Sequence, residues 1–120
     1  MNRRLVGWAA LSGAVAVMAG AYGAHGAVGR AAEWLRTGAQ YQMVHAVAVL
    51  ALGLHGRFRW SPALMLGGSI LFAATLYLMA VGGPLWLGAV TPLGGLAMIA
   101  GWIMLAWAAF RGDNHKEVRP

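Results

Sequence analysis

The chain has 120 residues, of which 60% are hydrophobic and only 10% are charged, whereas a soluble domain carries about 25% charged residues. The net charge is +6, but the basic residues lie at the ends of apolar blocks, a pattern typical of membrane topology and of anionic headgroups. Composition therefore excludes a soluble domain with a water-driven core, and the charge pattern argues against a nucleic-acid partner.

Four apolar blocks are each long enough to cross a bilayer, which takes about 20 residues. They cover residues 5–24, 38–56, 62–82 and 92–110. We expect an all-α fold: one integral membrane domain over residues 1–120, built as a four-helix bundle whose core forms by helix packing in lipid. Two arginines before the first block would also suit a signal peptide, but we expect this block to remain as a helix.

The first block carries small residues on one helical face, at spacings of four and three, and the last block has a weaker version of the same pattern. The expected helix-packing residues are Gly13, Ala16, Gly20, Gly94 and Gly101. Small faces let helix backbones approach closely. Two interpretations stay open: packing within one chain, and an interface with a second copy or with another membrane protein.

The segment between the first two blocks, "VGRAAEWLRT" at 28–37, is amphipathic. Its small and apolar residues share one helical face, and Arg30, Glu33 and Thr37 lie opposite. This pattern predicts a short helix lying on the membrane interface. A polar loop is the alternative.

Glycine, proline and capping residues predict where the other helices begin and end. Gly56 should stop the second helix, and Ser61 with Pro62 should start the third as N-cap and first helical residue. "GGP" at 82–84 should end the third helix. Thr91 should cap the fourth helix, again before a proline.

The second block begins with polar residues that share one helical face, namely Tyr41, Gln42 and His45. A polar side chain facing lipid is costly, so this face should point into the bundle. We expect His45 to be buried, neutral and hydrogen-bonded. Polar residues of the other helices are expected at the same depth, and the indole N–H of Trp102, near mid-bilayer, also needs a partner. The expected ligand-binding set is Tyr22, His25, Tyr41, Gln42, His45, Tyr77 and Trp102.

This polar set has two possible roles. It could line a pocket for a small molecule or a lipid headgroup, or it could be a hydrogen-bonded network that fixes helix register. No nucleophile–base pair or metal-ligand spacing is present, so we predict no catalytic residue, no metal, no cofactor and no enzymatic activity. All three acidic residues lie outside the apolar blocks, which argues against an ion-coupled pump.

Basic residues predict the orientation of the chain in the membrane. With the N-terminus inside, the cytoplasmic side carries Arg3, Arg4, Arg57, Arg59, Arg111, Lys116 and Arg119. The opposite side carries only Arg30 and Arg36. We therefore expect both termini in the cytoplasm.

Four sequence stretches, in this order, resemble the YgdD-like small membrane proteins, a family of unknown function from bacterial inner membranes with mitochondrial relatives. They are "GAYGAHG", "TGAQYQMVHAVAVL", "LFAATLYLMAVGG" and "TPLGGLAMIAGW". The resemblance covers roughly residues 5–110 and departs at "FAATLY", where the family usually has Ser and Gly before Leu-Tyr. It implies four transmembrane helices and no activity. The motif positions are Tyr22, His25, Gly26, Tyr41, Gln42, His45, Tyr77, Thr91, Pro92 and Trp102.

Together these patterns predict a non-enzymatic inner-membrane protein in contact with membrane lipids. The leading hypothesis is an outward-facing polar pocket for a small molecule or lipid headgroup. A structural or assembly partner, as a homo-oligomer or with another membrane protein, is the alternative. A transporter or channel subunit is the third possibility.

Overall fold

The computed structural model describes residues 1–118, with side chains through Gly112, and contains helices but no strand over that range. The elements, in chain order, are α1 (Arg3–His25), α2 (Gly29–His55), α3 (Trp60–Ala80), the short 3₁₀ helix η1 (Leu85–Ala89) and α4 (Thr91–Val118). The all-α prediction is therefore confirmed for the described residues.

Three stretches are long and apolar enough to cross a membrane: α1, α3, and Leu85–Gly112, which joins η1 to α4. These helices expose many large apolar side chains, among them Val17, Leu78 and Ile103. Such side chains belong in lipid rather than in water. The 27-residue helix α2 is not among the three, and it is the helix whose first half carries the polar residues.

Most helix ends lie where turn chemistry predicts them. Gly56 ends α2 with a left-handed backbone (φ 79°), which its lack of a Cβ permits. α3 ends at Ala80, just before the glycine pair, and α4 begins at Thr91. The predicted start of α3 is wrong by two residues: it begins at Trp60, so Ser61 lies inside the first turn.

The segment 28–37 does not form a separate interfacial helix. Its residues from Gly29 onward are the first turns of α2, which continues without a break to His55. Gly38, the weakest helix former at the expected junction, packs against the Tyr77 ring instead of interrupting the helix. Burial of that ring offsets the low helix propensity of glycine.

The small face of α1 packs against α2. A Cβ added at Gly20 would lie 3.5 Å from the Ala39 Cβ, and one added at Gly13 would lie 3.8 Å from the Ala46 Cβ. Ala16, which lies between these glycines in the sequence, is also buried. These positions are therefore covered within the chain, which is the first of the two interpretations of the small face.

Helices α3 and α4 approach even more closely, at the glycines that the sequence singles out in the last block. A Cβ at Gly94 would lie 2.6 Å from the Phe72 backbone nitrogen and 2.7 Å from the Gly68 carbonyl oxygen. A Cβ at Gly101 would lie 2.7 Å from the Met65 side chain. Real side chains do not tolerate such distances, so these glycines permit backbone-to-backbone contact.

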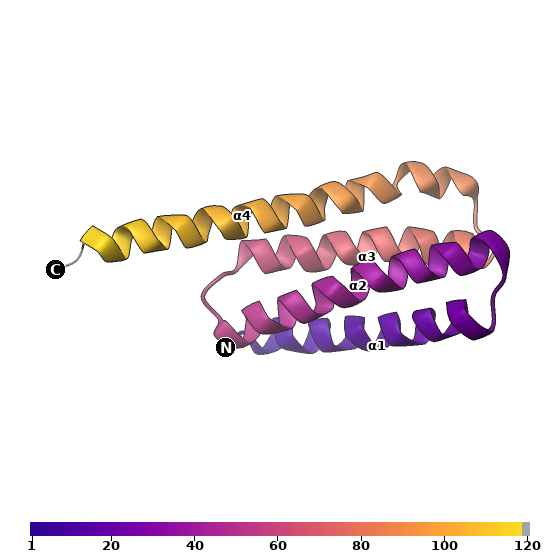
Figure 1. Cartoon of the computed structure of the whole chain (residues 1–120), viewed down its shortest axis with the longest axis horizontal. Coiled ribbons are helices and arrows are strands. Elements are labelled where there is room, and N and C mark those ends of the chain that lie inside the picture. Colours follow the sequence, from indigo (N-terminus) through magenta and orange to yellow (C-terminus); the bar gives the residue numbers. More distant parts are fainter. Residues whose placement is uncertain (119–120) are drawn as a thin grey trace.

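The four helices do not close into a bundle. α1 packs along α2, α2 along α3, and α3 along α4, as Figure 1 shows. Within the described residues, the backbone of α4 approaches α3 and η1 but neither α1 nor α2. The expected four-helix bundle is therefore not confirmed. The tight glycine contacts on one side of α4 hold it against α3, so its opposite side stays open.

The two ends of the described chain lie at the same end of the molecule (Figure 1). The α2–α3 connection, which carries Arg57 and Arg59, lies there too, and the Arg57 guanidinium lies against Gly112 of α4. Lys116 and Arg119, which also count toward the predicted orientation, lie outside the residues whose side chains are described. We call this the terminal end, and the end with the α1–α2 connection the distal end.

Candidate functional site

The structure divides the expected polar set into two clusters on different sides of α2. One cluster links Gln42 and Tyr77 toward α1, and the other links Tyr41, His45 and Trp102 toward α4. The sequence places these side chains on one helical face, but α2 has separate neighbours on its two flanks. The single pocket expected from the sequence is therefore not a single site.

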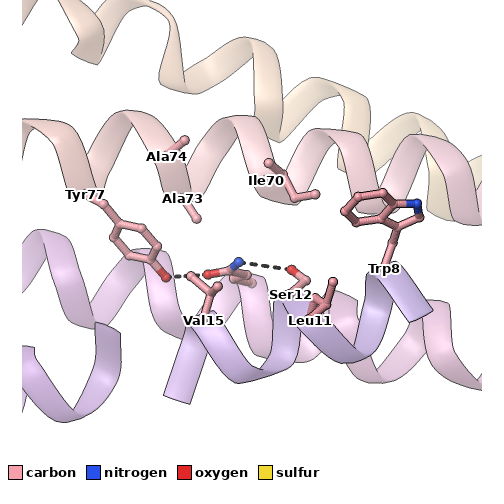
Figure 2. A pocket seen from close by; sticks show the side chains of 9 residues that line it. Trp8, Leu11, Ser12, Val15, Ile70, Ala73, Ala74 and Tyr77 are labelled. Carbon is pink, nitrogen blue, oxygen red and sulfur yellow. Dashed lines mark hydrogen bonds between the residues drawn. The ribbon is translucent and has the colours of Figure 1, made fainter. Parts of the chain in front are cut away.

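The first cluster is a chain of hydrogen bonds across three helices. Tyr77 Oη donates to Gln42 Oε1 at 2.6 Å, and Gln42 Nε2 donates to Ser12 Oγ at 3.0 Å. Figure 2 shows Tyr77 and Ser12 pointing toward each other across this chain. Gln42 is only 4% exposed and Ser12 5%. A buried amide with both of its polar atoms paired ties α1 and α3 to α2.

A groove runs beside this cluster, between α1 and α3 (Figure 2). Its volume is about 250 Å³. The walls are mainly apolar and include Trp8, Leu11, Val15 and Ile70. The polar groups beside this groove, Gln42, Ser12 and Tyr77, are hydrogen-bonded to one another. They therefore link the helices rather than present free donors and acceptors to a ligand.

The second cluster fixes the state of His45, which is 5% exposed. Trp102 Nε1 donates to His45 Nε2 at 2.9 Å, and His45 Nδ1 lies 2.7 Å from the Tyr41 carbonyl oxygen. An indole N–H can only donate, so Nε2 must accept and Nδ1 must carry the proton. His45 is therefore a neutral imidazole with both nitrogens paired, as expected from its position in the sequence. The Trp102 partner was not foreseen.

Aromatic rings surround His45. The Trp102 ring meets it edge-on, with centroids 5.8 Å apart, and the Tyr41 ring lies near both His45 and Phe72. Edge-to-face and offset arrangements are the favourable geometries for such rings. Because the backbones of α2 and α4 do not approach each other, the Trp102–His45 hydrogen bond is a side-chain bridge across an open space.

That space is a cleft of about 330 Å³ between α2 and α4. Its lining residues are Tyr41, His45, Phe72, Gly95, Met98, Ile99 and Trp102. A second hollow of about 270 Å³ adjoins it along α2, and its lining shares Tyr41 and His45 and adds Gln40 and Val44. The two hollows share Tyr41 and His45, and we refer to them together as the α2/α4 cleft.

Tyr22 and His25 belong to neither cluster. Tyr22 is 54% exposed and its ring lies beside Gly26, whereas His25 is exposed at the last position of α1. The small face of α1 turns toward α2, and Gly23 packs against Leu35 there. Tyr22 therefore points away from α2 and does not join the polar set in which the sequence analysis placed it.

The sequence analysis did not assign several residues of the two clusters and of the cleft lining, namely Ser12, Gln40, Val44, Phe72, Gly95, Met98 and Ile99. Ser12 lies three residues after Ala9 and four before Ala16, so it shares the small face of α1. A hydroxyl on a helix face that can pack against the polar stretch of the next helix is a usable signal. Phe72 carries no comparable signal, because an apolar ring on an apolar helix has no distinctive spacing.

The polar side chains of the two clusters are engaged in contacts within the protein. Over the described residues, no three His, Cys, Asp or Glu side chains come together in a way that would hold a metal ion. The buried polar atoms of both clusters are paired with one another. What the α2/α4 cleft offers a ligand is therefore apolar and aromatic surface, with polar groups only at its Gln40–Tyr41 end.

Comparison with known proteins identifies one family. Residues 19–95 match the model described as "Protein of unknown function (DUF423)". The chain is 37% identical to a UPF0382 membrane protein of Haemophilus influenzae, over 95% of this chain and 99% of that protein. It is 34% identical to the UPF0382 inner membrane protein YgdD of Escherichia coli K12, over 92% of each.

Two further comparisons complete this result. A UPF0382 membrane protein of Bacillus subtilis, YwdK, is 42% identical over 85% of this chain and 92% of its own length. No solved structure matches the chain. None of the matched descriptions states an enzymatic activity.

Proposed function

The chain belongs to the DUF423 (UPF0382) family of membrane proteins of unknown function, and from this premise we propose that it binds a membrane lipid laterally in the α2/α4 cleft. In this proposal the protein spans the inner membrane four times, as a single domain, and carries out no reaction. The lipid enters from the bilayer, between two helices, rather than from water.

The observation that carries this proposal is the separation of α4 from α2. The two helices are joined by the Trp102–His45 hydrogen bond, while their backbones stay apart. Trp102 is nevertheless 42% exposed, so one part of its ring faces the cleft. In a bilayer this apolar opening is filled by lipid chains, and its aromatic walls favour an ordered chain.

Placing α2 across the membrane follows from its neighbours. It packs antiparallel between α1 and α3, both of which are apolar enough to span. Its polar side chains Gln42 and His45 are turned inward and paired, which removes the cost of carrying them through lipid. Four spans then put both ends of the chain on one side of the membrane, and the basic residues favour the cytoplasm.

The alternatives have less support. A partner docking through the small faces would compete with contacts inside the chain, since Gly94 is buried against α3 and Gly20 packs against Ala39 of α2. The structural-network hypothesis suits the Ser12–Gln42–Tyr77 chain, whose polar atoms are mutually satisfied. A channel or transporter subunit would need a polar path along the helices, and the two clusters do not form one.

A glycine pair provides the test. A Cβ added at Gly95 meets no atom within 4 Å and would enter the cleft, so Gly95→Leu should fill it without displacing a helix. Gly67→Leu is the matched control, because Gly67 also has open space but lies on α3 outside the cleft. Each purified variant would be titrated in detergent with equal amounts of phosphatidylethanolamine and phosphatidylglycerol, and retained lipid would be counted by native mass spectrometry.

We expect the wild type and Gly67→Leu to retain lipid at concentrations at which Gly95→Leu has lost it. Equal retention by all three proteins would contradict the proposal. A loss in Gly67→Leu as large as that in Gly95→Leu would also contradict it, because lipid would then be bound to the helical surface generally.

A further inference from the structure

We infer that the α2/α4 cleft takes a zwitterionic phospholipid with a primary ammonium group, whose headgroup lies at the distal end against Arg30 and Glu33. Arg30 binds the phosphate and Glu33 binds the ammonium, while an acyl chain runs down the cleft toward Trp102. This rests on the proposed function, because it names the class of lipid that the same cleft takes.

The hollow along α2 identifies the face of that helix which is open beside α4. Its lining residues are Gln40, Tyr41, Val44 and His45. At 3.6 residues per turn, successive residues are about 100° apart, so these positions span a sector of about 140° around the helix. Any residue nearer the start of α2 that falls within this sector extends the same face toward the distal end.

The first turns of α2 place polar and aromatic side chains within that sector. The residues concerned are Arg30, Glu33, Trp34 and Thr37. Arg36 falls about 40° outside it by the same spacing, and its backbone nitrogen lies beside Gly23 of α1. Arg30 and Glu33 therefore continue the cleft face outward, whereas Arg36 does not.

The height of these residues is that of a lipid headgroup. The Trp102–His45 hydrogen bond gives matching heights on α2 and α4, which run in the same direction (Figure 1). Glu33 is twelve residues before His45, about 18 Å toward the distal end, and Thr91, where α4 begins, is eleven before Trp102, about 17 Å. Half of the hydrocarbon core is about 15 Å thick. With Trp102 near mid-bilayer, Glu33 lies just outside the hydrocarbon.

The Arg30 side chain brings its charge to the same height. Its guanidinium carbon lies 5.3 Å from the centroid of the Trp34 ring, the residue next to Glu33. Around the helix, Trp34 and Glu33 lie on opposite sides of Arg30. The guanidinium is therefore held over the aromatic ring rather than directed toward the carboxylate.

Arg30 and Glu33 give this face one positive and one negative charge. Both residues are exposed, and their spacing of three places their Cβ atoms about 5–6 Å apart. A guanidinium binds phosphate in a bidentate manner, and a carboxylate accepts hydrogen bonds from an ammonium. The connection at 81–90, which leads into α4, contains no charged residue. The paired charges match a zwitterionic headgroup, whereas an anionic lipid would leave Glu33 without a positive partner.

Two lipids with the same acyl chains provide the test. Phosphatidylethanolamine carries a phosphate and an ammonium, and phosphatidylglycerol carries a phosphate and a neutral glycerol. Purified full-length protein would be titrated with each in detergent, and native mass spectrometry would give the two apparent Kd values. We expect the wild type to bind phosphatidylethanolamine about two- to fivefold more tightly, the effect of one exposed ion pair. The net charge of +6 would by itself favour phosphatidylglycerol, so the sign of the preference is informative.

Three variants assign the preference to its residues. Glu33→Gln should remove it, because the ammonium loses its partner. Arg30→Gln should weaken binding of both lipids by a similar factor, because both carry the phosphate. Arg36→Gln is the matched control: it removes the same charge as Arg30→Gln but lies outside the cleft face, so both Kd values should stay unchanged.

The outcomes separate this inference from the proposed function. If Gly95→Leu weakens both lipids but the wild type binds them equally or prefers phosphatidylglycerol, the inference fails and the cleft still binds lipid. If Glu33→Gln keeps the preference, or Arg36→Gln weakens binding as much as Arg30→Gln, the headgroup is not held at this face and the inference fails. If Gly95→Leu leaves both titrations unchanged, the proposed function fails, and the inference with it.

Discussion

Two neighbouring polar residues of α2 serve different sides of the molecule. Gln42 pairs with Ser12 on α1 and with Tyr77 on α3, whereas His45, three residues later, pairs with Trp102 on α4. Each pairs with donors or acceptors that would otherwise be unpaired in an apolar setting. Leaving such a polar group unpaired there costs about 1–3 kcal/mol. These residues therefore link the helices in addition to being satisfied themselves.

Removing the Tyr77 hydroxyl should weaken the first cluster. Tyr77→Phe leaves Gln42 Oε1 without its donor, so we expect a loss of about 0.5–2 kcal/mol in unfolding free energy, the range for side-chain hydrogen bonds in membrane proteins. Chemical unfolding in mixed micelles would measure it. Tyr22→Phe is the control, because Tyr22 lies outside the cluster. A loss in Tyr22→Phe as large as that in Tyr77→Phe would refute the assignment.

The bond between Trp102 and His45 makes a spectroscopic prediction. Nitrogen-15 NMR should show His45 as the neutral tautomer protonated on Nδ1, because Nε2 accepts from the indole. Trp102→Phe removes that donor, so the Nε2 resonance should move toward that of an unpaired nitrogen. Trp107→Phe, an exposed change on the same helix, should leave it unmoved. A wild-type His45 protonated on Nε2 would contradict the geometry.

At the scale of helices, two kinds of small-residue contact hold the chain together. Between α1 and α2, added Cβ atoms at Gly13 and Gly20 would meet alanine Cβ atoms at ordinary van der Waals distance. Between α3 and α4, an added Cβ at Gly94 would collide with backbone. The second contact is therefore the more demanding, and it determines which side of α4 faces the protein.

Adjacent glycines on α4 test this difference. Gly94→Ala would place a Cβ 2.6 Å from the Phe72 nitrogen, so the helices must separate, and we expect a loss of about 1–3 kcal/mol or more in unfolding free energy. Gly95→Ala meets open space and should be neutral or stabilise by up to about 1 kcal/mol through helix propensity. Thermal unfolding in detergent would compare them. Equal stabilities would rule out close backbone packing at Gly94.

At the scale of the whole molecule, the even number of helices and the position of both chain ends agree with the orientation that the basic residues predict. The terminal end carries Arg3, Arg4, Arg57 and Arg59, and the distal end carries Arg30 and Arg36. The proposed fourfold crossing would place in lipid the large apolar side chains that are exposed between these ends.

Reporter fusions test this orientation. A fluorescent protein that matures only in the cytoplasm, fused after Pro120, should fluoresce, because both ends are expected inside. Alkaline phosphatase fused after Gly82, on the opposite side, should be active, since it folds only in the periplasm. The reverse pattern at both sites would show that the chain is inverted. A dark fusion at Pro120 with an active phosphatase at Gly82 would point to an odd number of spans.

Much of this protein can be predicted from its sequence alone, because the relevant forces are local. Apolar blocks determine where the helices lie, Gly56 and Thr91 mark their ends, and the spacing of Gly13, Ala16 and Gly20 identifies a packing face. The burial of His45 can also be predicted from the sequence around it. A histidine in a membrane-spanning segment has its lowest free energy when its imidazole is buried and hydrogen-bonded. The prediction of a separate helix over 28–37 is wrong. Packing of the Tyr77 ring against Gly38 stabilises a continuous helix by more than the low helix propensity of glycine destabilises it.

Only the tertiary structure decides which faces meet. Contact of α3 and α4 at Gly68 and Gly94 holds α4 against α3 and leaves it apart from α2, which opens the cleft. Residues three positions apart on α2 then face different partners, so one predicted site becomes two, and Tyr22 is excluded from both. Helical periodicity gives the relative directions of side chains along one helix, but the order of helices around it depends on contacts between residues far apart in the sequence.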